Sequence, residues 1–285
     1  MNIILVGKRL SFAHATGNFF YRALTKLGHS VTDVDIDKHS NLLPKLSDIQ
    51  KSYKADLLIV LKGHGIQPEW IAAVNCPTVL WYQDDAFEWE CARDDLLLSG
   101  AAYDHVFYFD HAQLELVKSL NISNVKYLPC ATDPAVYKYK PGTPKMYDIS
   151  FVGNVSQPRR AMLDRIARSF NINVQTVFLD QMVEVFNRTK INFNLSVGKT
   201  GFPLRIFEAL GMCSFLLTSH VPEEHRLFVD GVHLAYYTDD NLEAQIQYYL
   251  DKPKLRERIA NQGYKEVLQK HTFDHRMRQL LEEIT

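Results

Sequence analysis

Short apolar runs alternate with segments of helical periodicity along the whole of this sequence. Each run is rich in β-branched and aromatic residues, which is the pattern of strands buried on both faces of a sheet. Helical segments between the runs, such as that from Gly17 to about Leu27, predict a parallel sheet covered by helices. In the first half of the chain the predicted strands are Asn2–Val6, Ser30–Ile36, Ala55–Leu61, Pro77–Tyr82, His105–Phe109 and Val125–Leu128.

The stretch Tyr137–Lys145 interrupts this alternation. It contains two prolines, one glycine and no apolar period, and it is therefore predicted to be a linker. From Asn241 the chain is predicted to be helical, with a break at Pro253 and a final amphipathic helix after His271. Between the linker and Asn241 a second series of predicted strands comprises Tyr147–Val152, Val174–Leu179, Ile191–Leu195, Ser214–Leu217 and Leu234–Tyr237.

Two consecutive series of strands and helices predict an α/β protein with two Rossmann-like, doubly wound domains facing a central cleft. The predicted domains are residues 1–141 and 142–270, followed by a terminal segment, 271–285. A chain of 285 residues is long enough for two domains of ordinary size, at about 140 residues each.

Composition narrows the class of protein. Hydrophobic residues make up 46% of the chain and charged residues 23%, as in folded proteins. The net charge of −1 disfavours an extended nucleic-acid-binding surface. Four cysteines without a CxxC pair argue against a zinc knuckle or a disulfide scaffold. With no signal-peptide pattern and no apolar stretch of the roughly 18 residues that span a membrane, we expect a cytoplasmic protein without a membrane span.

One candidate anion site lies in YDISFVGNVSQPRRAMLDRI, which begins at Tyr147. A predicted strand ends at Gly153–Asn154, and a helix begins near Pro158 with Arg159 and Arg160 in its first turn. Unpaired N–H groups at the start of a helix, together with guanidinium groups beside it, suit a diphosphate. The alternative is an ordinary strand-to-helix turn with exposed arginines.

A second candidate is the segment Val197–Gly211, in which a glycine-containing loop leads from a strand into a helix. Arg205 and Glu208 are three residues apart and share one face of that helix. A carboxylate there can accept both ribose hydroxyls of a nucleotide, while Arg205 and the Thr200–Gly201 loop face its phosphates. The alternative is a solvated Arg–Glu ion pair. A P-loop is excluded because Phe193 stands where that motif requires glycine.

Three polar residues in the first half of the chain are candidates for acid–base chemistry. Asp84 and Asp85 follow one predicted strand, and His64 follows another, at the strand ends where open α/β sheets bind ligands. A carboxylate or an imidazole in this position can orient or deprotonate a hydroxyl group. The alternatives are helix capping for the aspartates and a polar surface position for His64.

Together these segments resemble the CgeB/spore-maturation-protein type of glycosyltransferase, which belongs with the group 1 transferases of GT-B fold. The resemblance covers nearly the whole chain in the family's order. In the C-terminal half it rests on YDISFVGN…PRR, VEVFNRTKINFNLS, PLRIFEALGMCSFLLTS…LFVDG and IANQGYKEVLQKHTFDHRMRQLL. In the N-terminal half it rests on ADLLIVLKGHG, PTVLWYQDD and YDHVFYFDHAQLELVKSLNISNVKYLPCATDP.

The resemblance implies transfer of a hexose-like sugar from a nucleoside diphosphate sugar, with a UDP-sugar as the expected donor, to an acceptor hydroxyl. The C-terminal domain would bind the donor without a metal, the N-terminal domain would bind the acceptor, and the terminal helix would cross back onto the N-terminal domain. Retention of the anomeric configuration is expected from the paired glutamates of group 1 relatives. The acceptor stays open between a glycan, a small molecule, a protein and a modified nucleobase.

The same resemblance assigns roles to individual residues. Gly153 and Asn154 match the phosphate-proximal loop, and Arg205 matches the arginine before Phe-Glu. Glu208 matches the second glutamate of the E-x7-E pattern, which holds the donor ribose. The first glutamate of that pattern is replaced by Thr200, so the usual contact to the donor sugar is missing from this sequence.

Two other functions fit the same sequence. One is a GT-B-fold sugar-nucleotide epimerase or hydrolase, which would need no acceptor. The other is a non-catalytic protein that binds sugar nucleotides or glycans, with Thr200 as the mark of a decayed donor site. A dinucleotide-dependent oxidoreductase is disfavoured because GKRLSF, from Gly7, follows the first strand in place of GxGxxG.

Overall fold

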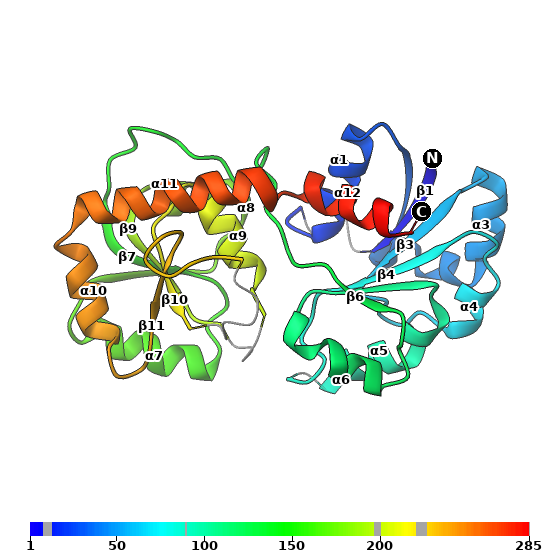
Figure 1. Cartoon of the computed structure of the whole chain (residues 1–285), viewed down its shortest axis with the longest axis horizontal. Helices are drawn as coiled ribbons and strands as arrows, with labels where there is room; N and C mark the ends of the chain where they lie inside the picture. The colour runs from blue at the N-terminus through cyan, green and yellow to red at the C-terminus, as the bar shows by residue number, and fades with distance from the viewer. Residues whose placement is uncertain (8–12, 89, 197–200, 221–226, 285) are drawn as a thin grey trace. The chain divides into compact units, whose positions relative to one another are not determined.

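The computed structural model describes residues 1–284 except 8–12, 89, 197–200 and 221–226 (Figure 1). The chain folds into two compact units. Unit 1 comprises Met1–Cys130 and Phe273–Thr285, and unit 2 comprises Ala131–Thr272. Each unit is built on one sheet whose named strands all pair in parallel, which confirms the predicted α/β class with two parallel sheets.

The sheet of unit 1 has the strand order β2-β1-β3-β4-β5-β6. Its first strand pairs with both the second and the third, in a register that sets Val6 opposite Val34 on one side and Val60 on the other. The chain therefore changes direction across the sheet between the first and third strands, which is a topological switch point. The strands are β1 (Asn2–Gly7), β2 (Ser30–Asp35), β3 (Leu57–Leu61), β4 (Thr78–Tyr82), β5 (His105–Tyr108) and β6 (Val125–Tyr127).

The C-terminal helix belongs to unit 1, as predicted, although it is last in the sequence. It lies beside the first helix in Figure 1, and the ring of Phe273 stacks on Phe19 at 5.1 Å between centroids. Arg276 is buried and its Nε donates to the carbonyl of Pro129 at 2.9 Å. The helices of unit 1 are α1 (Thr16–Lys26), α2 (Ile36–His39), α3 (Leu46–Tyr53), α4 (Pro68–Ala72), α5 (Glu90–Ser99), α6 (Leu114–Ser119) and α12 (Phe273–Ile284).

The sheet of unit 2 has the strand order β11-β10-β9-β7-β8. Here the seventh strand pairs with both the eighth and the ninth, so this sheet changes direction between β7 and β9. The strands are β7 (Tyr147–Val152), β8 (Ile172–Gln175), β9 (Thr189–Asn194), β10 (Leu216–Ser219) and β11 (Ala235–Tyr237).

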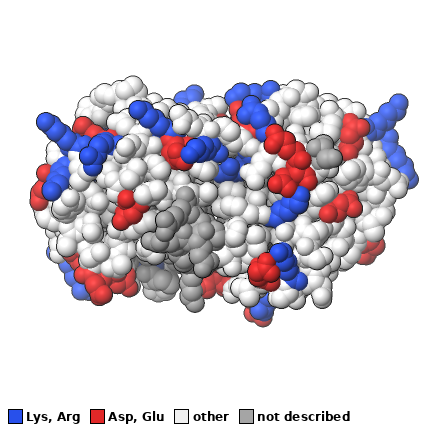
Figure 2. Space-filling view, viewed as in Figure 1, with Lys and Arg blue, Asp and Glu red and all other residues white. Residues whose placement is uncertain are grey.

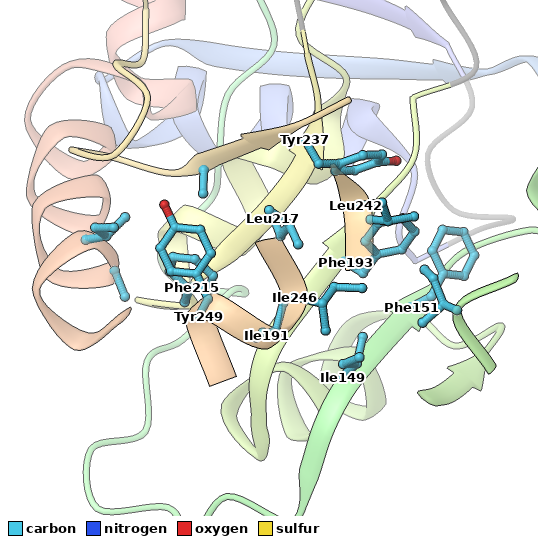
Figure 3. Close-up of a cluster of buried hydrophobic side chains, with 14 of the residues drawn as sticks. Ile149, Phe151, Ile191, Phe193, Phe215, Leu217, Tyr237, Leu242, Ile246 and Tyr249 are labelled. Carbon is cyan, nitrogen blue, oxygen red and sulfur yellow. The ribbon is translucent and has the colours of Figure 1, made fainter. Parts of the chain in front are cut away.

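An apolar core lies between this sheet and the helices of unit 2. Aromatic pairs contribute to it, with Phe193 stacked on Tyr237 at 5.1 Å and Phe215 packed on Tyr249 at 4.6 Å between centroids (Figure 3). The helices are α7 (Gln157–Ala167), α8 (Leu179–Asn187), α9 (Leu204–Gly211), α10 (Leu242–Leu250) and α11 (Pro253–Lys270).

The structure corrects one predicted strand. The run Val174–Leu179 was expected to continue as a strand, but β8 ends at Gln175 and α8 begins at Leu179. This strand lies at the edge of the sheet, where Val174 is 38% exposed, so its apolar residues do not mark a strand buried on both faces. Leu179 has a φ of +49°, in the left-handed region, at the point where the chain turns into the helix.

The boundary between the units lies at 130/131, earlier than the linker pattern indicates. The segment Tyr137–Lys145 has no helix or strand, but it is bound to unit 2 through Asn187. The side-chain amide of Asn187 accepts from the backbone N–H of Lys140 at 2.7 Å and donates to the carbonyl of Lys138 at 3.0 Å. These hydrogen bonds fix the linker to unit 2, which a polar, proline-containing sequence does not reveal.

The chain passes between the units at two points that lie side by side. Thr132 and Thr272 form a parallel bridge, and the N–H of Thr132 donates to the carbonyl of His271 at 3.0 Å. Among the described residues no helix is long and apolar enough to cross a membrane. On the face shown in Figure 2, positively and negatively charged side chains are interspersed.

Candidate functional site

The candidate donor site lies at the switch point of the unit 2 sheet. Phe151 of β7 is opposite Phe193 of β9, so these two parallel strands end at the same edge of the sheet. The loops that follow them, which begin at Gly153 and Leu195, therefore start next to one another. This is the position at which open α/β sheets bind ligands.

Arg159, in the first turn of α7, connects these two loops. Its Nη1 donates to the carbonyl of Asn154 in the first loop at 2.9 Å, and its Nε donates to the carbonyl of Leu195 in the second at 3.3 Å. The guanidinium also lies 5.7 Å from the centre of the Phe151 ring. The alternative of an exposed arginine at an ordinary turn therefore does not describe Arg159, which is half-buried and held from both strands.

Arg205 and Glu208, on α9, form a buried pair in the same unit. The Nη1 of Arg205 donates to Oε2 of Glu208 at 2.6 Å, and the two side chains are 19% and 6% exposed. The guanidinium also contacts the sulfur of Met182 and lies 5.8 Å from the centre of the Phe186 ring. The pair is therefore not the solvated surface ion pair that the sequence left open, because little water remains to screen it.

A tyrosine from the linker completes this pair. Tyr137 is buried, and its hydroxyl forms a hydrogen bond with Glu208. Burial, followed by the charge of Glu208, raises the pKa of Tyr137 well above its ordinary value, so the phenol stays neutral and can donate to the carboxylate. Glu208 is thus held by partners from two segments far apart in the sequence.

The electrostatics of Arg159 indicate a site for a negative group. Burial lowers the pKa of Arg159, and the positive charge of Arg205 lowers it further. Within the part of the chain that the structure describes, no carboxylate forms an ion pair with Arg159. Two guanidinium groups near enough to repel each other, one without a counter-ion, would both be stabilised by a bound anion.

The glycines of these loops have structural roles that differ in part from the expected ones. The amide of Gly153 donates to the carbonyl of Gln175 at 3.0 Å, so it is engaged in the sheet. This differs from the expectation that Gly153 belongs to a loop that contacts phosphate. A Cβ at Gly153 would lie 3.2 Å from the Phe151 ring and 4.0 Å from Nη1 of Arg159. Gly201 is buried with a φ of +73°, and Thr200 lies outside the described residues.

A second cluster of polar residues lies at the carboxyl ends of the neighbouring strands β3 and β4 in the unit 1 sheet. It contains His64, in the loop after β3, and Asp84, in the loop after β4, both named from the sequence. Lys62 Nζ lies 2.8 Å from a carboxylate oxygen of Asp84, and Nδ1 of His64 lies 2.5 Å from Oδ2 of Asp95 on α5. Nε2 of His64 is 3.9 Å from Oδ2 of Asp84, so the structure brings the two predicted residues together.

Asp85 has different surroundings from its neighbour Asp84. It is buried, and its Oδ1 accepts hydrogen bonds of 3.0 Å each from the N–H groups of Phe87 and Glu88 and from the side-chain amide of Gln113. These contacts support the alternative in which Asp85 caps the loop that follows β4.

Three residues that contribute to these clusters were not named from the sequence. Lys62 precedes the GHG motif directly, and a cation next to a candidate base was a usable signal. Asp95 and Tyr137 had no such signal, because an acidic residue on a helix and a tyrosine in a linker are common. Among the described residues no group of three or more His, Cys, Asp or Glu side chains is placed to hold a metal ion.

Comparison with a family model identifies the class of the protein. Residues 147–282, slightly less than half of the chain, match the model of a family described as glycosyl transferase-like. The match includes β7, α7, α9 and α12, and therefore both arginines of the candidate donor site. By sequence alone, no curated protein is similar to the chain.

Solved structures extend this assignment to the fold of the whole chain. An alpha-glucosyltransferase in complex with UDP-glucose and DNA containing an abasic site is similar with a TM-score of 0.72 and 12% identity, over 99% of this chain and 98% of that one. Anabaena Alr3699/HepE in complex with UDP and glucose gives a TM-score of 0.66 and 12% identity, over 98% of each chain. Sucrose-phosphate synthase from Thermosynechococcus elongatus gives a TM-score of 0.69 and 12% identity, over 99% of this chain and 98% of that one.

The family match and the shared fold confirm the predicted class of protein. The chain has the GT-B fold and is a glycosyltransferase, an enzyme that transfers a sugar from a nucleotide sugar.

Proposed function

We propose that the protein transfers a hexose from a UDP-sugar to an acceptor hydroxyl, with the donor bound by unit 2. The choice of UDP is supported by the similar structures that contain UDP or UDP-glucose. Within the group 1 transferases we assign the chain to the CgeB/spore-maturation type, on the motifs quoted above. A cytoplasmic location suits the free thiols of Cys76, Cys130 and Cys213.

The observation that carries this proposal is the pair of arginines at the unit 2 switch point. As the glycosidic bond of the donor breaks, negative charge develops on the leaving diphosphate. Arg159 and Arg205 are already held in place by backbone carbonyls, by Glu208 and by aromatic rings, so they need little reorganisation to stabilise that charge. In this proposal Glu208 also contacts the donor ribose.

The acceptor, in this proposal, is activated by the polar cluster of unit 1. His64 and Asp84 lie at the edge of the sheet where a ligand binds, and each side chain is about one third exposed, at 36% and 34%. Asp85 is assigned to loop structure on the contacts of its Oδ1. The acceptor class stays open between a glycan, a small molecule, a protein and a modified nucleobase.

The first experiment is a thermal-shift panel with UDP, GDP, TDP, CDP, ADP and their common sugar conjugates. A nucleotide at about 100 times its Kd stabilises the folded state by roughly 2.7 kcal/mol, which gives a clear increase in Tm. We expect the largest increase with UDP and UDP-sugars. Equal responses to all the nucleotides, or none to any, would contradict the proposed donor. Conversion of the sugar nucleotide that is no faster with any hydroxyl acceptor than in water alone would instead support an epimerase or hydrolase.

The role of Glu208 is tested by substitution. Glu208→Gln removes the charge that holds Arg205 but nearly preserves the volume of a buried side chain. Loss of a hydrogen bond to a charged group costs about 1.5–3 kcal/mol, so we expect UDP affinity to fall by about tenfold or more. Isothermal titration calorimetry measures the Kd directly. Glu257→Gln, at an exposed position on α11 of the same unit, is the matched control and should bind UDP like the wild type.

Arg159→Met separates phosphate binding from ribose binding. The variant keeps a long apolar side chain against Phe151 but removes the guanidinium. Inorganic pyrophosphate should raise the Tm of the wild type and have little effect on this variant. An equal pyrophosphate response in both proteins would show that the diphosphate is bound elsewhere.

A further inference from the structure

In the polar cluster of unit 1, His64 and Asp84 are each held by a further charged residue. Asp95 reaches His64 from α5, with Oδ2 at 2.5 Å from Nδ1, and its Oδ1 lies 3.4 Å from the N–H of Gly65. Lys62 holds Asp84 on the other side of the imidazole ring. Each titratable residue of the cluster thus has its own partner, and only Nε2 of His64 and the Asp84 carboxylate face each other without a direct hydrogen bond.

The contact with Asp95 determines which ring nitrogen can act as a base. An ionised carboxylate has no hydrogen to donate, so Nδ1 of His64 must carry the proton in this hydrogen bond. In the neutral imidazole Nε2 then has a free lone pair. Its distance of 3.9 Å from Oδ2 of Asp84 is too long for a hydrogen bond, yet one hydroxyl oxygen can lie about 2.8 Å from both atoms.

The backbone of this loop is unusual in a way that suits a site. Lys62, Gly63 and Gly65 have φ values of +66°, +69° and +69°, and a lysine is rarely found in the left-handed region. Such conformations cost about 1–3 kcal/mol for a residue other than glycine and persist where surrounding contacts require them. Here the turn places the side chains of Lys62 and His64 next to Asp84.

We propose that Asp95 is a positioning residue that holds His64 in the tautomer with Nε2 unprotonated, so that Nε2 accepts the proton of the acceptor hydroxyl. This inference rests on the transferase function proposed above. In the step, the acceptor oxygen forms a bond to the anomeric carbon and its proton passes to Nε2; this single displacement inverts the anomeric configuration, in place of the retention expected from the resemblance to group 1 relatives. The bond from that carbon to the diphosphate oxygen breaks, and the electron pair leaves with the diphosphate. Solvent later removes the proton from His64.

A purely structural role for Asp95 is the alternative, because it also contacts the Gly65 amide. Asp95→Asn distinguishes the two roles. Its Oδ1 can still accept from Gly65, but its amide group can donate to Nδ1 and so favour the other tautomer. Asp94→Asn is the matched control, since Asp94 precedes Asp95 on the same helix and is exposed.

The tautomer is read from the ring ¹⁵N shifts of His64 in the full-length protein labelled with ¹⁵N-histidine, recorded at alkaline pH. His64→Gln assigns the signal. We expect the wild type and Asp94→Asn to carry the proton on Nδ1, and Asp95→Asn to move it toward Nε2. A wild-type ring protonated on Nε2, or a tautomer unchanged in Asp95→Asn, would overturn the proposal.

Turnover supplies the second measurement, as release of UDP from UDP-glucose with water as the acceptor. General base catalysis contributes roughly 10²–10⁴-fold, so we expect His64→Gln to lose most of that factor and Asp95→Asn at least about tenfold in kcat, with the Kd for UDP unchanged. Equal kcat values in Asp95→Asn and Asp94→Asn would overturn the proposal. A wild type that binds no uridine nucleotide would overturn the proposed function itself. This result is distinct from a kcat that is lowered, or unchanged, in Asp95→Asn.

Discussion

At the scale of single residues, neighbours in the sequence have different partners and therefore different chemistry. Asp84 and Asp85 are adjacent, but Asp84 forms an ion pair with Lys62 and remains partly exposed. Asp85 is buried, and its Oδ1 accepts three hydrogen bonds. A carboxylate whose oxygen is already occupied in this way has less capacity to accept a substrate proton. The type of residue indicates a possible base, and its contacts decide whether it is available.

His233 gives the stability of unit 2 a predictable pH dependence. Burial is the main cause of its lowered pKa, and its Nδ1 accepts the N–H of Val229 at 3.1 Å, a bond that protonation of Nδ1 would break. The unfolded chain therefore binds a proton at His233 more readily than the folded chain does. Its contribution to stability is present above pH 6.5 and is lost as the pH falls below that value.

We therefore expect the Tm of the wild type to fall as the pH is lowered through the histidine range. In His233→Gln this fall should be smaller, whatever the absolute Tm of the variant, because the titrating group is gone. Scanning calorimetry at a series of pH values measures the slope of Tm against pH for the wild type and for the variant. Identical slopes would show that His233 does not titrate differently in the folded and unfolded states.

At the scale of elements, close packing of helices positions the candidate donor site. The longest helix of unit 2, α11, contacts α9, which carries Arg205 and Glu208. Gly263 allows this approach: a Cβ there would overlap the backbone carbonyl of His233 and lie 2.8 Å from Leu210 on α9. Backbone atoms cannot move aside as the end of a flexible side chain can.

Gly263→Ala should therefore destabilise unit 2. In a helix interior alanine is favoured over glycine by about 0.5–1 kcal/mol, but overpacking costs typically about 1–3 kcal/mol. We expect a net loss of stability, measured by urea denaturation, together with weaker UDP binding if α9 shifts. Gln262→Ala, at the preceding exposed position of α11, should be neutral or slightly stabilising. A stable Gly263→Ala protein would mean that the two helices can separate at little cost.

At the scale of the whole molecule, the last helix of the chain completes the first unit. Phe273 is buried against Phe19 and Phe20, and Lys26 pairs with Asp274 at 2.5 Å. Unit 1 therefore cannot complete its core until the segment from Phe273 has been synthesised, although its named strands lie in the first 130 residues.

Phe273→Ala should weaken unit 1 selectively. Truncation of a buried phenylalanine costs about 3–5 kcal/mol, and the rings that Phe273 packs on, Phe19 and Phe20, lie in unit 1. Hydrogen exchange followed by mass spectrometry should show faster exchange in α1 and β1 with little change in β7 and β9. Arg278→Ala, at an exposed position of α12, is the control. Equal loss of protection in both units would mean that they unfold as one.

The sequence by itself determined the repeated alternation of strands and helices, the α/β class and the class of enzyme. Hydrophobic periodicity is a local property, so most strands were placed to within two residues, as with Tyr147–Val152. It failed at Val174–Leu179, because an edge strand is not buried on both faces and an apolar run there does not mark where the strand ends.

Only the tertiary structure decided which side chains of the candidate site meet. His64 and Asp95 are 31 residues apart, and Arg159 and Arg205 lie on different helices, α7 and α9. Whether such residues touch depends on strand order and on loop conformations such as the left-handed Lys62, none of which leaves a periodic pattern in the sequence. Local periodicity specifies the elements, and the packing of distant segments specifies the chemistry at their ends.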